Sequence, residues 1–282
     1  MKRKRDSIGF LSSLFAIVVG LLVGFLILLV SNPSQAGAGF WTIITGPLTH
    51  GSKGVGQVFY YATPIILTGL SVGFAFKTGL FNIGSSGQFI MGAFAAVVVG
   101  IKGEALGSVQ WVVALFTAIL AGAIWGAIPG LVKAYFNVNE VIACIMTNYI
   151  GMYLVNYLVS TNKGLYDKIH NYSKSVAETA NIPRMGLDKI FEGSSVNGGF
   201  FIAVIAVVVI YILLNKTTFG YELKAAGFNK DASKYAGMNE KRNIVLSMAI
   251  AGALSGLAGA LLYLAGSGKH IEIQDVLAGE GF

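Results

Sequence analysis

Residues 8–30 read IGFLSSLFAIVVGLLVGFLILLV, a run of 23 residues without a charged side chain. As an α-helix it is roughly 34 Å long, enough to cross the apolar core of a bilayer with some tilt. The basic start MKRKR resembles that of a signal peptide, whose apolar run is shorter, about 7–15 residues. We therefore interpret 8–30 as a retained first membrane helix, although Ser34-Gln35-Ala36 leaves cleavage open.

Six further apolar runs follow, at about 55–76, 88–101, 109–132, 138–160, 199–215 and 244–266. The run 88–101 is short for a span, so its helix is expected to begin within the glycine-rich stretch before it. In lipid only helices and closed barrels satisfy their backbone hydrogen bonds, and these runs lack the alternation of barrel strands. The sequence predicts one all-α transmembrane domain over residues 1–282, a polytopic helical bundle of about seven spans.

The composition agrees with a lipid-facing exterior. Hydrophobic residues make up 55% of the chain and charged residues 12%, against roughly 25% charged in soluble domains. The net charge of +7 comes from basic residues beside apolar runs, which indicates membrane topology and not a nucleic-acid partner. A single cysteine, Cys144, excludes an intrachain disulfide, and three scattered histidines do not suggest a metal site.

Charge also predicts the orientation. With Lys2-Arg3-Lys4-Arg5 in the cytoplasm, alternation of spans places 161–198 and the C-terminus outside and 216–243 inside. Six basic residues lie in that inner segment, as expected for a cytoplasmic loop: Lys216, Lys224, Lys230, Lys234, Lys241 and Arg242. The external loop 161–198 is polar, and Pro183 and Gly186 make one continuous helix there improbable.

The segment 217–242, TTFGYELKAAGFNKDASKYAGMNEKR, does not have the composition of a linker. A short helix is predicted at 221–226, stopped by Gly227 in a left-handed conformation. Asn229 is expected to cap a second helix at about 230–236, ended by Gly237. Two such helices on a membrane face form a platform that can pass a push from a soluble partner into the spans; the alternative is a basic loop that only maintains orientation.

The stretch 76–89, FKTGLFNIGSSGQF, breaks the apolar pattern with glycines and with polar side chains that include Asn82 and Gln88. Broken helices at membrane depth can present amides to a polar substrate, and a glycine-rich packing seam is the alternative. Gly84-Ser85-Ser86-Gly87 matches an intramembrane serine protease pattern, but no histidine base falls in a span. We therefore expect no catalytic residues.

A third polar series lies in 137–157, NVNEVIACIMTNYIGMYLVNY. Glu140 begins the apolar span, where it can cap the helix, while Asn139, Asn148 and Asn156 need hydrogen-bonding partners if they face hydrocarbon. Asn148 and Glu140 project to similar sides of one helix. Interhelical hydrogen bonding and substrate contact are equally good interpretations of these residues.

Three stretches together resemble the signature regions of ribose/nucleoside-type ABC importer permeases, and the likeness runs from about residue 56 to 266. They are GLSVGFAFKTGLFNIGSSGQFIMGA, NEVIACIMTNYI and GYELKAAGFNKDASKYAGMNEKRNIVLSMAIAGALSGLAGA, in that order. The chain is most similar to permeases of Gram-positive nucleoside (guanosine-type) importers. Two differences stand out: Ser86 replaces a glutamate that is usual there, and the chain stops at Gly279-Glu280-Gly281-Phe282, where such permeases continue with further spans, so truncation is one interpretation.

The resemblance implies a bacterial cell-membrane subunit that works with a second permease, two ATP-binding subunits and an external substrate-binding lipoprotein. ATP would be bound by the partner, and this chain would hold no cofactor. Gly220 to Gly237 would be the coupling segment, with its characteristic positions at Glu222, Ala225, Gly227 and Asn229. The candidates for the translocation path are Asn82, Gln88, Asn139, Glu140 and Asn148.

The predicted function is alternating-access import of nucleosides, driven by the partner ATPases. A sugar permease of the same type is the alternative within this class. A secondary carrier without ATP would place several ionisable residues deep in its spans, where only Glu140 comes close. A non-transport scaffold would leave the polar interruption at 76–89 unexplained.

Overall fold

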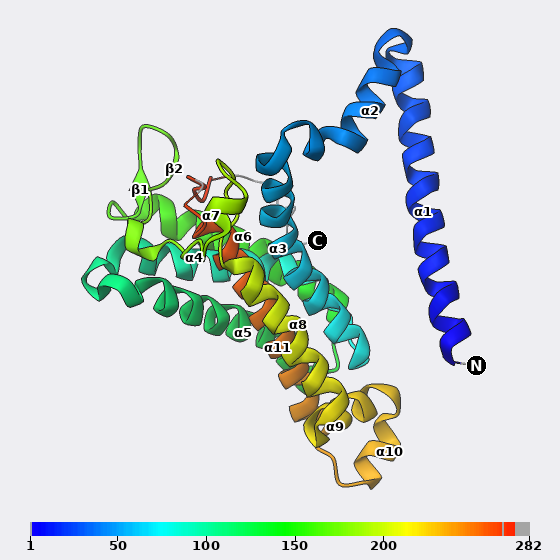
Figure 1. Ribbon diagram of the computed structural model, residues 1–282. Helices are drawn as coiled ribbons and strands as arrows, with labels where there is room; N and C mark the ends of the chain where they lie inside the picture. Colours follow the sequence, from blue (N-terminus) through cyan, green and yellow to red (C-terminus); the bar gives the residue numbers. More distant parts are fainter. Residues whose placement is uncertain (1, 267, 274–282) are drawn as a thin grey trace. The chain divides into compact units, whose positions relative to one another are not determined.

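The computed structural model describes residues 2–266 and 268–273, without the side chains of 2–10, 13, 228 and 230–232. These residues form a helical protein with two very short strands (Figure 1). The elements are α1 (Lys2–Ser31), α2 (Pro33–Thr49), α3 (Gly51–Lys77), α4 (Ser85–Lys102), η1 (Glu104–Val109), α5 (Gln110–Phe136), α6 (Glu140–Thr161), β1 (Tyr166–Asp167), β2 (Tyr172–Ser173), η2 (Glu178–Ala180), α7 (Leu187–Ile190), α8 (Gly199–Lys216), α9 (Thr218–Phe228), α10 (Lys230–Tyr235) and α11 (Glu240–Tyr263).

Seven helical segments of the described chain are long and apolar enough to cross a membrane. They lie in α1, α3, α4, η1 with α5, α6, α8 and α11, at the positions of the seven apolar runs. The short run at 88–101 belongs to α4, which begins at Ser85 within the glycine-rich stretch. The predicted polytopic helical membrane protein is therefore confirmed.

The chain divides into two compact units, Met1–Val55 and Gly56–Phe282. In the first unit α1 packs against α2, with the rings of Phe25 and Phe40 4.8 Å apart and Ala36 buried. Sequence reasoning assigned no helix between the first two spans. Pro33 at the first turn of α2 suits a helix start, because its fixed φ is helical and its missing N–H would have no partner there.

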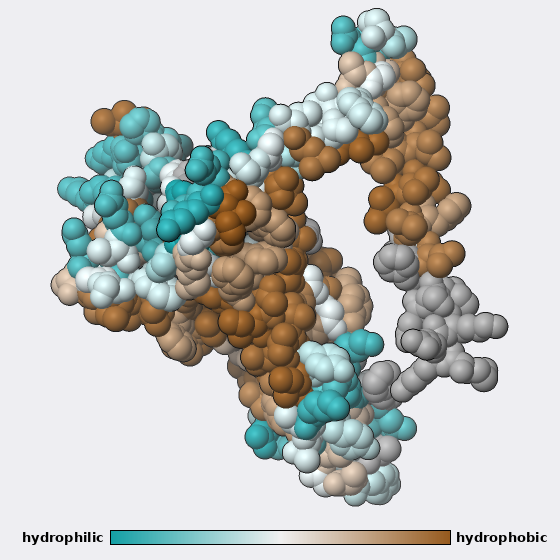
Figure 2. Space-filling model, viewed as in Figure 1, coloured by the Kyte–Doolittle hydropathy of each residue, from teal (hydrophilic) through white to brown (hydrophobic). Residues whose placement is uncertain are grey.

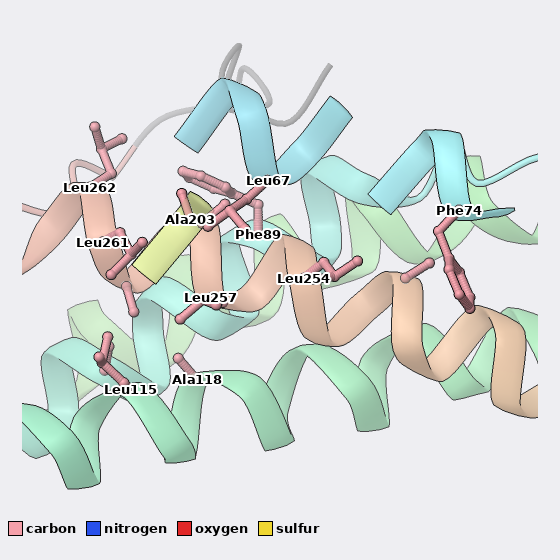
Figure 3. Close-up of a cluster of buried hydrophobic side chains, with 14 of the residues drawn as sticks. Leu67, Phe74, Phe89, Leu115, Ala118, Ala203, Leu254, Leu257, Leu261 and Leu262 are labelled. Atoms are coloured by element: carbon pink, nitrogen blue, oxygen red, sulfur yellow. The ribbon is translucent and has the colours of Figure 1, made fainter. Parts of the chain in front are cut away.

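The core of the second unit is built around α11, which packs along α4 and α5. Figure 3 shows leucines of α11, among them Leu254, Leu257 and Leu261, beside Leu115 and Ala118 of α5. Most of α11 is buried, although the helix has the apolar composition of a membrane span. It therefore forms the centre of this unit, with α4 and α5 packed along it.

Close contact between the α11 backbone and its neighbours depends on glycine. A Cβ atom on Gly252 would overlap the carbonyl oxygen of Gly122, and one on Gly256 would overlap that of Ala118. A Cβ atom on Gly92 of α4 would likewise overlap the Gly256 backbone. Small residues let membrane helices approach this closely and gain van der Waals contact that lipid does not supply. These glycines therefore set the spacing of α4, α5 and α11.

The segment 161–198 is folded, but it contains no long helix, in keeping with Pro183 and Gly186. β1 and β2 pair antiparallel, and Ser173 joins this hairpin to residues beyond α11. The Ser173 N–H donates to the Ile271 carbonyl at 2.9 Å, and the Ile271 N–H donates to Ser173 Oγ at 3.0 Å. The turn of the hairpin is held by Asp167, whose pKa is lowered by hydrogen bonds from His170 and from the Ile169 N–H.

Polar residues cover two ends of the second unit. Figure 2 shows an apolar band over α8, with polar surface over 161–198 at one end and over α9 and α10 at the other. Such a band flanked by polar caps is the surface expected of a protein that crosses a bilayer. The C-terminal residues Gly279 to Phe282, predicted to lie outside, fall beyond the described residues.

We predict that Gly256→Leu destabilises the protein by about 1–3 kcal/mol or more, the range typical of overpacking, because the new side chain meets the α5 backbone at Ala118 and Gly122. Thermal unfolding in detergent measures the loss. Gly69→Leu is the matched control, since Gly69 lies in α3 with open space around it. Equal melting temperatures for the two variants would contradict the proposed packing.

Candidate functional site

Within the polar interruption predicted at 76–89, residues 78–84 form a connection without regular helix between α3 and α4. Its centre is a reciprocal pair of amides from Asn82 and Gln88. Asn82 Nδ2 donates to Gln88 Oε1 at 2.8 Å, and Gln88 Nε2 donates to Asn82 Oδ1 at 2.9 Å. Both side chains are fully buried, so the pair satisfies groups that would otherwise be costly in an apolar interior.

The amide pair continues into a chain of hydroxyls that joins three helices. Asn82 Nδ2 also donates to Ser71 Oγ of α3 at 3.1 Å, and Ser71 Oγ donates to the Ala251 carbonyl of α11 at 2.7 Å. Ser255 of α11 donates to Ser71 at 2.9 Å and lies 2.8 Å from Ser85 Oγ of α4. We call Ser71, Asn82, Ser85, Gln88 and Ser255 the amide–hydroxyl network.

Asn148 ties α6 to the same region. Its Oδ1 accepts from the Gly87 N–H at 2.8 Å, and its Nδ2 donates to the Ile83 carbonyl at 2.9 Å. The side chain is buried, and both ends of its amide bond to backbone of the 83–87 stretch. Asn148 therefore lies beside the amide–hydroxyl network and fixes α6 against it.

Asn139 and Glu140 lie elsewhere, at the first turn of α6. Asn139 is exposed and caps the helix, with its Oδ1 accepting from the Val141 N–H at 2.8 Å. Glu140 forms an ion pair with Lys133 of α5. Of the five predicted path residues, the structure thus brings together Asn82, Gln88 and Asn148, and it places the other two near the end of α6. Contact of any of them with a substrate remains a prediction.

The predicted coupling segment contains two short helices, α9 and α10, and the first is longer than predicted, because it begins at Thr218 and not at Tyr221. Gly227 does not stop the first helix, which continues to Phe228 and ends at Asn229 in extended backbone. Gly237, with a φ of +77°, follows the second helix in the expected left-handed conformation. Sequence reasoning misjudged Gly227 because a C-terminal cap and a close helix contact both favour glycine.

That close contact joins α9 to the start of the polar interruption. A Cβ atom on Gly79 would overlap the Gly227 backbone, and one on Gly227 would overlap the carbonyl of Thr78. Leu223 and Ala226 of α9 are buried beside this point. Gly79 and Gly227 are far apart in sequence, and no sequence pattern or spacing indicates that they are in contact. Only two residues separate Gly79 from Asn82, so the contact connects the coupling segment to the amide–hydroxyl network.

A small cavity of about 40 Å³ lies beneath α9, and its volume is enough to hold water. Its lining includes Gly79, Gly227, Lys133 and Asn243, and the buried Asn243 Nδ2 has no hydrogen-bonding partner among the described residues. The packing between α9 and the spans is therefore incomplete at the point where the two glycines meet.

The remaining predicted coupling positions are at least partly exposed. Glu222 and Ala225 are half-buried and Asn229 is exposed, while Tyr221 and Tyr235 are 64% and 94% exposed. Tyrosine is enriched in protein interfaces, where its ring buries area and its hydroxyl forms hydrogen bonds. The outer face of α9 and α10 can accordingly dock a soluble protein.

These features define a polytopic helical membrane protein with a buried polar network beside the connection between two spans and a compact two-helix platform at one end. Residues 54–281 match the family described as branched-chain amino acid transport system / permease component. The chain belongs to this family of ABC transporter permeases, and the match covers the second compact unit.

Several curated proteins are similar over most of the chain. The guanosine ABC transporter permease protein NupP of Bacillus subtilis is 42% identical over 95% of this chain and 76% of its own length. The nucleoside ABC transporter permease protein NupB of Lactococcus lactis is 34% identical over 87% and 68%. A glucose ABC transporter permease of Haloferax volcanii is 32% identical over 76% and 57%. No solved structure matches the chain significantly.

We predict that Asn82→Leu lowers the melting temperature, because it leaves the Gln88 amide and the Gly84 N–H without their bonds. Each buried group left unsatisfied costs about 1–3 kcal/mol. Asn215→Leu is the matched control, since Asn215 is exposed and bonds only to the Tyr211 carbonyl of its own helix. If thermal unfolding in detergent did not distinguish the two variants, Asn82 would not have the structural role described.

Proposed function

We propose that the chain is the permease subunit of an ATP-driven importer that moves nucleosides across the bacterial cell membrane by alternating access. The observation that carries this proposal is the similarity to two permeases named for guanosine and nucleosides, at 42% and 34% identity. Membership of the permease family supports an importer of this kind.

The proposed assembly has a second permease subunit, ATP-binding subunits and an external substrate-binding lipoprotein. ATP is held by the partner, and this chain supplies the membrane path without a cofactor. The N-terminus and 216–243 face the cytoplasm in this proposal, which the six basic residues of the latter segment support. The exposed face of α9 and α10 is the docking surface for the ATPase, with Glu222, Ala225, Gly227 and Asn229 at the contact.

The proposed conformational change begins when closure of the ATPases moves α9. Because Gly227 touches the Thr78–Gly79 backbone, a shift of α9 displaces the loop that carries Asn82. The cavity beneath α9 leaves room for such a shift. Opening of the Asn82–Gln88 pair would then free the two amides for substrate and let α3, α4 and α11 move relative to one another. Asn139, Glu140 and Asn148 complete the proposed path along α6.

We predict that Gly227→Ala uncouples transport, because its methyl group forces α9 away from Thr78. Guanosine uptake should fall by roughly 2- to 30-fold, the range for a coupling contact altered by about 0.5–2 kcal/mol. The control, Ala236→Val, adds bulk at an exposed position of the same segment. Wild-type uptake by Gly227→Ala, in a complex that still co-purifies with its ATPase, would refute the coupling assignment.

A sugar is the second candidate substrate, favoured by the 32% identity to a glucose permease. Uptake of radiolabelled guanosine and ribose, compared in a deletion strain with and without the gene, separates the two. We expect gene-dependent guanosine uptake that excess unlabelled adenosine or inosine reduces and ribose does not. Gene-dependent uptake of ribose alone would replace the nucleoside proposal by the sugar one.

A further inference from the structure

Three tyrosines lie along one exposed face of α6. Tyr149, Tyr153 and Tyr157 recur every four residues, so they project to similar sides of the helix, and they are 47%, 55% and 64% exposed. Tyr149 is nine residues after Glu140 and twelve before Thr161, which places it roughly 14 Å and 18 Å from the two helix ends. A bilayer core is about 30 Å thick, so Tyr149 lies near its middle.

The exposed face of α6 also carries Ile142, Ile145, Met146 and Ile150, but the tyrosines among them distinguish it from the exposed faces of α5 and α8. At the middle of α5 the exposed side chains are Phe116, Leu120 and Ile124. The exposed residues of α8 are aliphatic or Phe as far as Val209, and Tyr211 follows only in the last turns before Lys216. Tyrosines near helix ends match the aromatic belt at membrane interfaces, which accounts for Tyr157 but not for Tyr149.

The opposite face of α6 is occupied by packing. It contacts α4 and α5, with residues such as Cys144, Asn148 and Val155 buried. The hydroxyls of Tyr149 and Tyr153 have no hydrogen-bonding partner among the described residues, and a hydroxyl left unpaired in hydrocarbon is unfavourable. Both tyrosines therefore suit surroundings that contain water or polar groups better than lipid tails.

We infer that the Tyr149–Tyr153–Tyr157 face of α6 lines the substrate path, where its rings stack against the planar base of the passing nucleoside. This inference rests on the proposed function. It places the tyrosines on a side of the substrate path that the five predicted path residues do not form. Aromatic rings stack on any nucleobase because every base has a π-face, which suits a path that must release its cargo. The hydroxyls can bond to water or to the ribose as the base moves on.

The reactivity of introduced cysteines with a water-soluble reagent tests whether this face of α6 contacts water. In a Cys144→Ala background, Tyr149→Cys and Tyr153→Cys are compared with Leu120→Cys of α5 and Val208→Cys of α8, positions of similar exposure. The assembled importer is placed in lipid nanodiscs and treated with a charged methanethiosulfonate reagent. We expect modification at 149 and 153, slowed by guanosine, and little at 120 and 208. Equal reactivity at all four positions, or modification at 149 and 153 that guanosine does not slow, would overturn the inference.

Transport variants provide a second measurement. Tyr149→Leu should raise the KM for guanosine uptake about tenfold, whereas Tyr149→Phe, which keeps the ring, should change it by less than about threefold. Equal values for the Leu and Phe variants, in complexes that assemble normally, would contradict stacking. If the unsubstituted importer does not transport guanosine, the proposed function fails; the labelling pattern without substrate still shows whether α6 faces water.

Discussion

Backbone contact between α11 and its neighbours is the constraint on which the second unit depends. Gly252 and Gly256 meet carbonyl groups of α5, and Gly92 brings α4 to the same surface. At this spacing the Ser71, Ser85 and Ser255 hydroxyls of three helices lie within hydrogen-bonding distance of one another. Backbone-to-backbone packing at these glycines therefore sets the geometry of the polar groups. Such close packing matters in lipid, because apolar burial does not drive helices together there.

The amide–hydroxyl network has two physical consequences. Because its members bond to one another, they stabilise the described arrangement of α3, α4 and α11, and they are not exposed to a substrate in it. Because Asn82 follows closely on the Gly79–Gly227 contact, a displacement of α9 acts directly on the network. In the proposed mechanism, this buried polar cluster holds one state until movement of α9 by a partner supplies the energy to leave it.

Much of the fold could be predicted from local composition. Long apolar runs identify the spans, since length and hydropathy are local properties, and the polar interruption at 76–89 marked the break before α4. The backbone contact of Gly227 could not be predicted, because its partner, Gly79, lies in the distant connection between α3 and α4. The sequence marked Asn82, Gln88 and Asn148 as polar residues in or beside apolar runs, and the structure buries all three. Sequence alone does not tell an internal hydrogen bond from contact with a substrate. The tyrosines of α6 could not be singled out from the sequence, because only the structure shows which face of α6 is exposed.

The most direct test of the account is whether ATP drives this chain's transport. The assembled importer, reconstituted in proteoliposomes with its binding protein, allows guanosine uptake and ATP hydrolysis to be measured together. We expect uptake to require ATP on the side of the ATPase and to stop with a non-hydrolysable analogue. Guanosine uptake at the same rate without ATP would contradict this expectation and would indicate a carrier driven by another gradient.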